Sequence, residues 1–473
     1  MITLRPYQID AVAQIRQAFA DKFKAPLYVL PTGGGKTTVF AAIAESSEKR
    51  GKRVLILAHR VELVDQIVDR LREFSVNPDI IAAGYARCNG SARASNRAVA
   101  VASVQTLVRR LDSYPAPTLI VGDEAHHFSN GNTFSKIVRH YPTARLLGVT
   151  ATPIRGDGRG LASHFDKLIL GPNPAQLMDE GYLVRARVFA PPTVDTSGLH
   201  IRAGEFKTEE SESLVNTPSI TGDVVSHYKQ HANGTAALVF CTSVQHAHDV
   251  ATKFRQERID AIALSGTTDR EVRRLAVREF REGKIKVLCS CDLFSEGFDV
   301  SGVHVGILLR PTASLGLFLQ QVGRCLRPAP GKSHAIILDH VGNTQRFGLP
   351  DEPRDDWELT DDIMHNKAPK KPPPRVCVKC FASSPSHARA CAECKHPFKV
   401  KQRQEVETVD GQLHEVMPLT PEELARKRER REQGMAQTRE QLLAVARIKG
   451  WNPRRVDYIL AGRERKKLKK ETA

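Results

Sequence analysis

The residues most suited to chemistry begin with a glycine-rich segment, LPTGGGKT, at Leu30–Thr37. It follows a short apolar run and precedes a stretch with helical spacing, which is the context in which such a loop binds phosphate. Lys36 is expected to reach the terminal phosphates and Thr37 to hold Mg²⁺. The expected phosphate-binding residues are Thr32, Gly33, Gly34, Gly35, Lys36 and Thr37. The strict pattern has glycine where Leu30 stands, and a tight turn without a ligand is the alternative interpretation.

A second set of candidate catalytic residues ends another apolar run, Leu119–Gly122, which continues into DEAH at residues 123–126. Asp123 is expected to hold Mg²⁺ and Glu124 to orient the water that attacks the terminal phosphate, with His126 beside them. Acidic clusters on loops are usually only solvated. The position of this one, at the end of a buried strand downstream of a phosphate loop, favours nucleotide hydrolysis instead.

A third candidate segment, QQVGRCLR, lies at Gln320–Arg327. We expect a helix here that carries Gln320, a candidate nucleotide contact, and on which Arg324 and Arg327, three residues apart, project from one face. Guanidinium groups form planar charge-assisted hydrogen bonds to phosphate and stabilise the charge that develops during phosphoryl transfer. An ordinary ion pair on a helix surface is the alternative.

Four cysteines near the carboxyl end, Cys377, Cys380, Cys391 and Cys394, form two C-x2-C pairs separated by ten residues. This is the spacing of two thiolate-bearing knuckles around one tetrahedral ion, and Zn²⁺ is the expected metal. The other five cysteines are scattered, which is unlike a secreted disulfide framework. The sequence leaves open whether the cluster also contacts phosphate or is a purely structural clip.

The elements that must position these residues alternate between short apolar runs and amphipathic stretches. This pattern is typical of a parallel sheet covered by helices on both faces, so the expected fold class is α/β. A first series of strands is expected at residues 27–30, 54–58, 98–101, 119–122 and 146–149. A second series is expected at residues 236–240, 261–264, 285–288, 305–309 and 335–338. The two series predict two tandem lobes.

The alternation of apolar runs and amphipathic stretches also predicts the domain boundaries. Between the two series, prolines, glycines and polar residues replace the alternation, which indicates a connection. After the second series, consecutive prolines at 372–374 indicate an extended linker. We expect a first lobe at residues 1–172, a connection at 173–221, a second lobe at 222–347, a linker at 348–375, a zinc-binding module at 376–400 and a basic helical tail at 401–473.

Composition restricts the class of protein. Of the 473 residues, 41% are hydrophobic and 26% charged, which excludes a chain disordered throughout. No run approaches the roughly 18 apolar residues of a membrane span, and the start lacks the apolar segment of a secretory signal, so we expect a cytoplasmic protein with no membrane partner. The net charge is +17, and residues 365–473 hold 26 basic and 13 acidic residues, leaving only +4 for the rest. A basic tail attracts phosphate backbones, although its positive potential would attract an acidic protein as well.

The three phosphate-related segments, in this order, resemble those of the superfamily 2 DEAD/DEAH-box helicases over residues 1 to about 345. The resemblance implies two RecA-like lobes with ATP and Mg²⁺ in the cleft between them. It makes Arg327 the arginine finger, with Arg324 beside it. Two other short strings, LRPYQ at residues 4–8 and SEGFD at residues 295–299, look like nucleotide-contacting segments of that family. Their expected nucleotide-binding residues are Arg5, Gln8, Gly297 and Asp299.

Further strings resemble the segments with which that family grips a nucleic-acid backbone. They are LAHRVELVDQ at residues 57–66, SVQTL at 103–107 and VFCTSVQHA at 239–247. The candidate nucleic-acid contacts are His59, Arg60, Gln105, Thr106, Thr242 and Ser243. VTATP at residues 149–153 resembles the motif that couples hydrolysis to the nucleic-acid surface through Thr150 and Thr152, whose hydroxyl groups suit a switchable hydrogen-bond network.

Within the superfamily, TATPIRGDGRGL at residues 150–161, together with the cysteine cluster, looks most like the RadD-like DNA-repair helicases and related bacteriophage helicases. This closer resemblance implies single-stranded or forked DNA as the partner, held through its backbone, and an ATP-driven motor that moves along it. Three alternatives stay open: an ATP-regulated nucleic-acid clamp without unwinding, an RNA helicase, and the motor subunit of a restriction system.

Overall fold

The computed structural model describes most of the chain. The described residues are 2–85, 97–129, 131–190, 199–202, 205–215, 218–291, 302–352, 357–362, 374–398 and 438–449, with Leu293, Arg354, Asn452, Val456, Asp457, Ile459 and Leu460. They fall into two units, residues 1–400 and residues 401–473. Within the described part of the chain, no helix is both long and apolar enough to cross a membrane.

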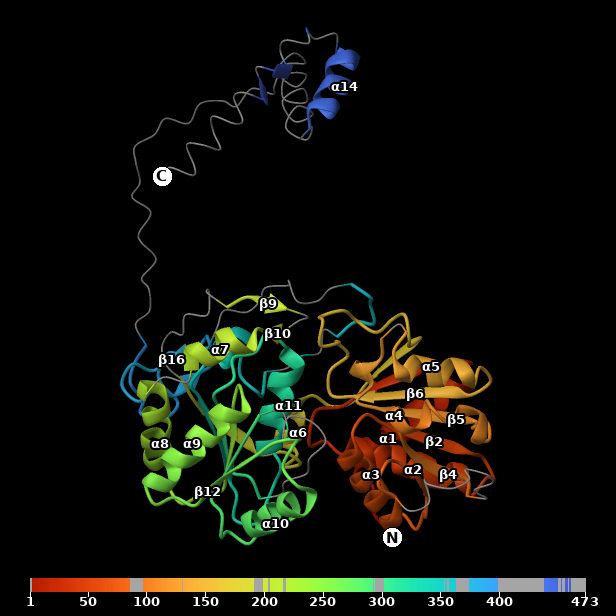
Figure 1. Ribbon diagram of the computed structural model, residues 1–473, viewed down its shortest axis with the longest axis horizontal. Coiled ribbons are helices and arrows are strands. Elements are labelled where there is room, and N and C mark those ends of the chain that lie inside the picture. Colours follow the sequence, from red (N-terminus) through yellow and green to blue (C-terminus); the bar gives the residue numbers. More distant parts are fainter. Residues whose placement is uncertain are drawn as a thin grey trace. The chain divides into compact units, whose positions relative to one another are not determined.

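The first lobe (red to orange in Figure 1) is built around a parallel sheet. This sheet has seven strands in the order β3-β4-β2-β5-β6-β1-β7. The strands are β1 (Pro26–Val29), β2 (Val54–Ala58), β3 (Asp79–Ile81), β4 (Val99–Ser103), β5 (Leu119–Asp123), β6 (Arg145–Thr150) and β7 (Lys167–Leu170). The helices are α1 (Pro6–Ala20), α2 (Lys36–Glu48), α3 (Val61–Glu73), α4 (Val104–Leu107) and α5 (Thr133–His140). Because β5, β6 and β1 are neighbours, their carboxyl ends bring together the loops that follow them.

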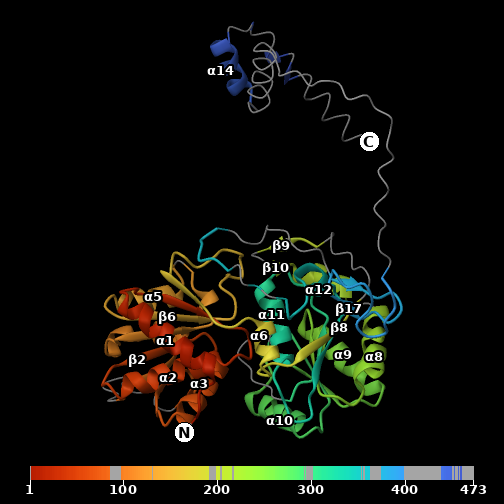
Figure 2. The same ribbon diagram turned by 180° about the vertical axis from the view of Figure 1, so that it is seen from behind.

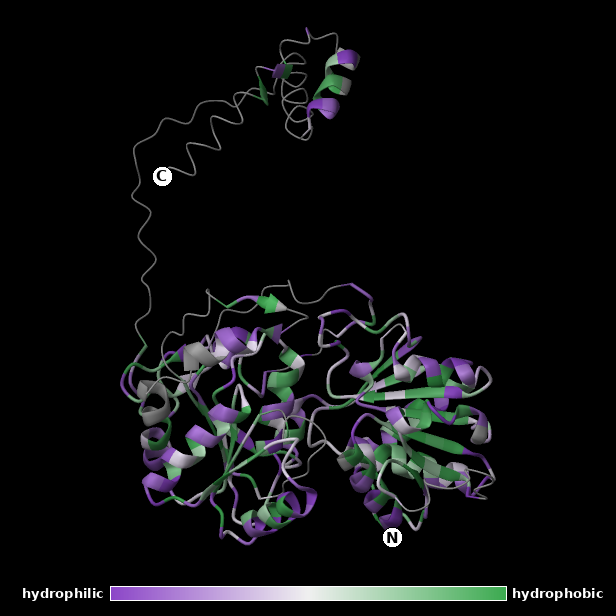
Figure 3. Ribbon diagram, in the orientation of Figure 1, coloured by the Kyte–Doolittle hydropathy of each residue, from purple (hydrophilic) through white to green (hydrophobic). Residues whose placement is uncertain are grey.

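The second lobe contains a six-stranded parallel sheet with the order β12-β13-β11-β14-β15-β8. Its strands are β8 (Arg185–Phe189), β11 (Ala237–Phe240), β12 (Ala261–Leu264), β13 (Val287–Ser290), β14 (Val305–Leu308) and β15 (His334–Asp339). Its helices are α8 (Pro218–Ala232), α9 (Val244–Gln256), α10 (Arg270–Arg281), α11 (Leu315–Cys325) and α12 (Asn343–Phe347). The strands of both sheets are coloured mainly as hydrophobic and the outer helices carry polar residues (Figure 3). This confirms the α/β class with two parallel-sheet lobes.

Residues 173–221, for which the sequence indicated only a connection, contain the edge strand β8. Its sequence, RARVF, places arginine at every second position, so Arg185 and Arg187 face outward and no continuous apolar run marks the strand. The same region holds α6 (Pro174–Asp179), the hairpin of β9 (Ile201–Arg202) and β10 (Glu205–Phe206), and α7 (Thr208–Val215). The edge strands β3 and β7 of the first sheet were likewise not expected, because each is short and only partly buried.

The cysteine-bearing segment is attached to the second lobe through β8. It carries the small pair β16 (Arg375–Val376) and β17 (Ser383–Ser384), and β17 lies beside β8 (Figure 2). The Ala190 amide donates to the Phe381 carbonyl at 3.1 Å, and the Arg187 guanidinium forms an ion pair with Glu393. The segment is therefore anchored to the second sheet by backbone and side-chain contacts.

A short segment after the second lobe returns to the first. Residues 357–361, here called the strap, dock beside the loop that follows β6. The Ala162 amide donates to the Thr360 carbonyl at 3.3 Å, and the Ser163 amide donates to Asp361 Oδ1 at 2.8 Å. Leu359 packs against an apolar cluster of the first lobe. The strap thus ties the end of one lobe to the surface of the other.

The second unit is small in its described part. The helix α14 (Arg439–Lys449) buries Leu442 and Ala446 against Val456, and Arg439 forms an ion pair with Asp457. Trp451 and Tyr458, the aromatic residues of the basic tail, lie outside the described residues.

Candidate functional site

The glycine-rich loop lies between β1 and α2, as its sequence context indicated. Gly33 and Gly35 have φ angles of +87° and +91°, a left-handed conformation that L side chains rarely adopt. Space is restricted as well, because a Cβ atom on Gly35 would lie 2.5 Å from Gln8 Nε2. Leu30, which departs from the strict pattern, is fully buried, and its amide donates to the Thr150 carbonyl at 3.0 Å. The departure does not disturb the curl of the loop.

Lys36 opens α2 and is buried, with Nζ 3.4 Å from the Leu30 carbonyl oxygen. Burial lowers the pKa of Lys36, and the carboxylates of Glu124 and Asp123 oppose that shift. Arg324 and Arg327 of the second lobe also act on the same ammonium group and lower its pKa further. Groups from both lobes therefore share one electrostatic environment around Lys36.

The DEAH segment begins at the last residue of β5. Asp123 is buried, and this burial together with the charge of Glu124 raises its pKa to about 7, although Lys36 opposes the shift. Two buried carboxylates crowded together would be stabilised by a divalent cation, so this donor set fits Mg²⁺. Asp123 is the residue that would hold the ion, with Thr37 at the start of α2 as the second ligand expected from the sequence.

Helix α11 packs directly on the glycine-rich loop. A Cβ atom on Gly323 would lie 2.5 Å from Thr32 Cβ, and one on Gly33 would lie 3.3 Å from Arg327 Cγ. Glycine at both positions is what allows the two lobes to approach so closely. Gln320 Nε2 reaches His126 Nε2 of the first lobe at 3.4 Å. The arginines thus lie on the face of the second lobe that is turned toward Lys36.

One detail differs from the expected helix. Helix α11 ends at Cys325, with Leu326 as its carboxyl-terminal cap, so Arg324 is helical and Arg327 is not. Pro328 explains the end, because a residue that precedes proline is disfavoured in helical conformation. The turn after the helix nevertheless leaves the Arg327 side chain half-buried, and desolvation lowers the pKa of its guanidinium.

Two of the expected nucleotide-binding residues, Arg5 and Gln8, lie beside the same loop. Gln8 is buried in α1; its Oε1 accepts from the Arg5 amide at 3.0 Å, and its Nε2 lies 3.5 Å from the Gly34 carbonyl oxygen. In this structure Gln8 therefore supports the loop. The Arg5 guanidinium lies 4.5 Å from the ring centre of Tyr182, and the Tyr7 hydroxyl donates to the Gly34 carbonyl at 2.6 Å. Sequence reasoning missed both tyrosines, since a lone aromatic residue carries no local signal.

The expected coupling residues form a connected network. Thr150 Oγ1 is 3.0 Å from His126 Nδ1 and donates to the Thr152 carbonyl at 2.9 Å. A Cβ atom on Gly316 of the second lobe would lie 3.0 Å from Thr152 Oγ1. Both threonines are buried, and they connect the DEAH segment with the second lobe.

The candidate nucleic-acid contacts are divided between the lobes. In the first, His59 and Arg60 follow β2, and Gln105 Nε2 donates to the His59 carbonyl at 2.8 Å; Thr106 is in the same short helix as Gln105. In the second, Ser243 caps α9, and buried Thr242 bonds His246 through its hydroxyl at 2.9 Å. These two hydroxyl groups therefore already have structural partners. Gly297 and Asp299 lie outside the described residues.

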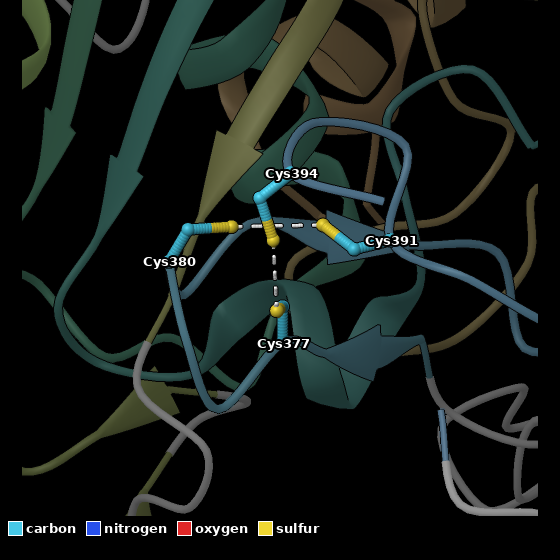
Figure 4. Close-up of side chains that lie close together, drawn as sticks. All are labelled: Cys377, Cys380, Cys391 and Cys394. Atoms are coloured by element: carbon cyan, nitrogen blue, oxygen red, sulfur yellow. Dashed lines mark hydrogen bonds between the residues drawn. The ribbon is translucent and has the colours of Figure 1, made fainter. Parts of the chain in front are cut away.

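The four cysteine side chains point toward one another (Figure 4). The sulfur atoms of Cys377 and Cys394 are 3.5 Å apart, those of Cys380 and Cys391 are 3.6 Å apart, and all four lie within 4.8 Å of one another. Zn–S bonds of about 2.3 Å place the sulfur atoms of a tetrahedral site about 3.8 Å apart, whereas a disulfide needs about 2.05 Å. The four thiols therefore have the geometry of a metal site and fit Zn²⁺.

Comparison with known proteins identifies the family. Residues 1–155 match the family described as "Type III restriction enzyme, res subunit", and residues 220–329 match "Helicase conserved C-terminal domain". The chain belongs to the superfamily 2 helicases. This is a superfamily of ATP-hydrolysing enzymes, so the chain carries an ATP-hydrolase architecture in both of its lobes.

Three relatives illustrate the similarity. A "51.5 kDa protein" of Lactococcus phage (isolate 7-9) is 33% identical over 81% of this chain and 80% of its own length. The "Putative ATP-dependent helicase IRC3" of Saccharomyces cerevisiae is 30% identical over 72% of this chain, which spans only 51% of that protein. A solved fragment of a putative HsdR subunit of a type I restriction enzyme from Vibrio vulnificus YJ016 shares the fold, with a TM-score of 0.59 and 21% identity over 75% of this chain and 68% of that one.

Proposed function

We propose that this superfamily 2 helicase is an ATP-driven DNA translocase that moves along or remodels single-stranded or forked DNA, in repair, recombination or replication. The observation that supports the proposal most is the electrostatic grouping of Lys36 and Asp123 of the first lobe with Arg324 and Arg327 of the second. A site divided between two lobes changes its geometry when the lobes move. Such a change can be transmitted to a bound strand.

Each residue has a role in this proposal. Lys36 and the loop amides bind the terminal phosphates of ATP, and Glu124 orients the attacking water. Arg324 and Arg327 stabilise the charge that develops on the transferred phosphoryl group. Mg²⁺, held by Asp123 and Thr37, neutralises the phosphate oxygens when bound.

The strand contacts are proposed for His59, Arg60, Gln105 and Thr106, with Thr242 and Ser243 on the second lobe. Backbone contacts of this kind carry little sequence preference. The basic excess of residues 365–473 favours a polyanion as partner, and an acidic protein docked on the tail is a secondary proposal. We assign Zn²⁺ to the cysteine cluster and a cytoplasmic location to the protein, since free thiols suit a reducing compartment.

The test combines two substitutions with three polymers. Lys36→Ala should reduce ATP turnover by about 100-fold or more, because it removes a charged donor from the terminal phosphates. Lys49→Ala is the matched control, since Lys49 lies at the opposite end of α2 from Lys36 and its exposed side chain pairs with Glu45. Glu124→Gln should bind ATP and turn it over very slowly. Substantial turnover by the Lys36→Ala variant would refute the site.

The polymer is tested by comparing the stimulation of ATPase activity by single-stranded DNA, forked DNA and RNA, followed by a strand-displacement assay. Stimulation by DNA together with displacement supports the translocase. Stimulation without displacement favours the ATP-regulated clamp, and preferential stimulation by RNA favours an RNA helicase.

A further inference from the structure

A second histidine follows the DEAH segment, and no role described above uses it. The His127 ring lies 4.1 Å from the ring centre of His59 and 4.4 Å from that of His126. The rings are tilted by 47° and 39° to each other, so the three imidazoles form a continuous row of contacting rings, here called the stack. It joins the end of β2, where strand contacts are proposed, to the end of β5, where hydrolysis is proposed.

Both ends of the stack are attached to other groups. At one end, the His59 carbonyl accepts from Gln105, and Gln105 Oε1 accepts from the Ser103 hydroxyl at 2.8 Å. At the other end, His126 contacts Thr150, and its Nδ1 lies 3.4 Å from Glu124 Oε2. A displacement of the His59 ring can thus be transmitted through packed rings to His126, which lies beside Glu124.

The backbone strengthens this route. The His127 amide donates to the Glu124 carbonyl at 3.0 Å, and the Asn132 side chain donates to the His127 carbonyl at 2.6 Å. Glu124 has a φ of 50°, in the left-handed region that a residue with a side chain occupies at a cost of about 1 kcal/mol. A backbone held in this unfavourable conformation responds to small shifts of its hydrogen-bonded neighbours. Moving His127 therefore changes the orientation of Glu124.

We propose that His127 is a positioning residue that couples strand contact at His59 and Gln105 to the orientation of Glu124. The coupling acts through ring packing between His59, His127 and His126. The proposal rests on the proposed function, because it assumes that a strand contacts His59. The ring contacts act in both directions, so occupation of the ATP site should also change the surroundings of the His59 ring.

The first test compares His127→Ala, which removes the ring, with His127→Phe, which keeps a ring for stacking. The readouts are the ratio of DNA-stimulated to DNA-free ATP turnover and the affinity for a labelled oligothymidylate. We expect the ratio to fall at least five-fold in the Ala variant and to return to within two-fold of the parent in the Phe variant. Affinity should change less than two-fold in both. His140→Ala is the control, because His140 is a histidine of the same lobe whose ring meets Tyr141 edge-on and lies 3.7 Å from Asp112, away from the three imidazoles.

An unchanged ratio in His127→Ala, or equally low ratios in both variants, would overturn the proposal. A second measurement needs no nucleic acid. In protein labelled at its histidine rings, ADP–beryllium fluoride with Mg²⁺ should shift the NMR signal of His59, identified with His59→Asn, in the parent and in the Phe variant only. The same shift in the Ala variant would also overturn the proposal. If no polymer stimulates the parent, the proposed function fails, and the NMR comparison still decides the role of His127.

Discussion

A single methyl group added at Gly160 should prevent the strap from docking on the first lobe. Gly160 lies in the loop after β6, and a Cβ atom there would be 1.7 Å from the Thr360 carbonyl oxygen and 2.7 Å from its carbonyl carbon. Its φ is not in the left-handed region, so alanine is compatible with the local backbone. Gly160→Ala therefore acts on the strap and leaves the conformation of the first lobe itself unchanged.

The size of the effect follows from the contacts that the strap makes. Ordinary van der Waals contact begins near 3.4 Å, so the Thr360 carbonyl must retreat by about 1.7 Å. Such a shift breaks the hydrogen bonds of the Ala162 and Ser163 amides, each contributing about 1 kcal/mol, and uncovers half-buried Leu359, which contributes about 1 kcal/mol more. These three contacts together stabilise docking by about 3 kcal/mol. Since undocking the strap costs only this free energy and relieves the clash with the new methyl group, the strap should be mostly undocked in the Gly160→Ala variant.

Trp357 provides the assay. It lines an apolar cavity together with Leu319 and Val322 of α11, Leu170 of the first lobe, and Pro350. The chain has two tryptophans, so a Trp451→Phe background leaves Trp357 as the single reporter. Undocking should shift its emission to longer wavelength and increase quenching by acrylamide.

Gly156→Ala is the matched control for the strap. Gly156 lies in the same loop, and a Cβ atom there would meet nothing within 4 Å. If Gly160→Ala gave the same emission and quenching as Gly156→Ala, the argument from the close contact would be refuted.

Two further predictions concern the metal module and the contact between lobes. Chelation or Cys391→Ser should release one Zn²⁺ per chain and lower the unfolding temperature of the second lobe more than that of the first, because Cys377 and Cys391 belong to the buried cluster of the second sheet. Metal analysis and calorimetry test this prediction, with Cys291→Ser as the control. Equal shifts of the unfolding temperature in both lobes would contradict it. Asp65 of α3 accepts from Arg270 of α10 at 2.8 Å across the lobes and also bonds Tyr85. Since this ion pair is half-exposed, it contributes at most about 1 kcal/mol. Arg270→Asp or Asp65→Arg alone should therefore raise the KM for ATP by up to about five-fold, and the two substitutions combined should restore it. If the combined variant did not restore KM, the pair would have no role in bringing the lobes together.

Local sequence carried most of the information about the sheets and the phosphate loop. Strands such as β2 and β5 are buried along their whole length, so each appears as an unbroken apolar run. The edge strand β8 was missed because one of its faces is exposed and carries arginine. The loop, the DEAH segment and α11 could be found because each is a short continuous string whose chemistry depends on adjacent residues.

Contacts between distant segments could not be predicted in the same way. The strap meets Ser163 from a position 198 residues away, and nothing in either segment indicates the other. The stacking of His59 on His127 has the same character, since an isolated histidine gives no sign of its neighbours. The end of α11 before Arg327 was foreseeable in principle, because Pro328 stands next to it.

The attachment of the cysteine segment to β8 has a consequence for solubility. A strand at the rim of a sheet presents unsatisfied amides and carbonyls that invite pairing with another molecule. Here the Phe381 carbonyl and the bridge between Phe189 and Ala382 occupy that rim. Loss of the metal would therefore expose this edge of the sheet, where other molecules could pair with it. The first sign of zinc depletion should be self-association of folded molecules at high concentration.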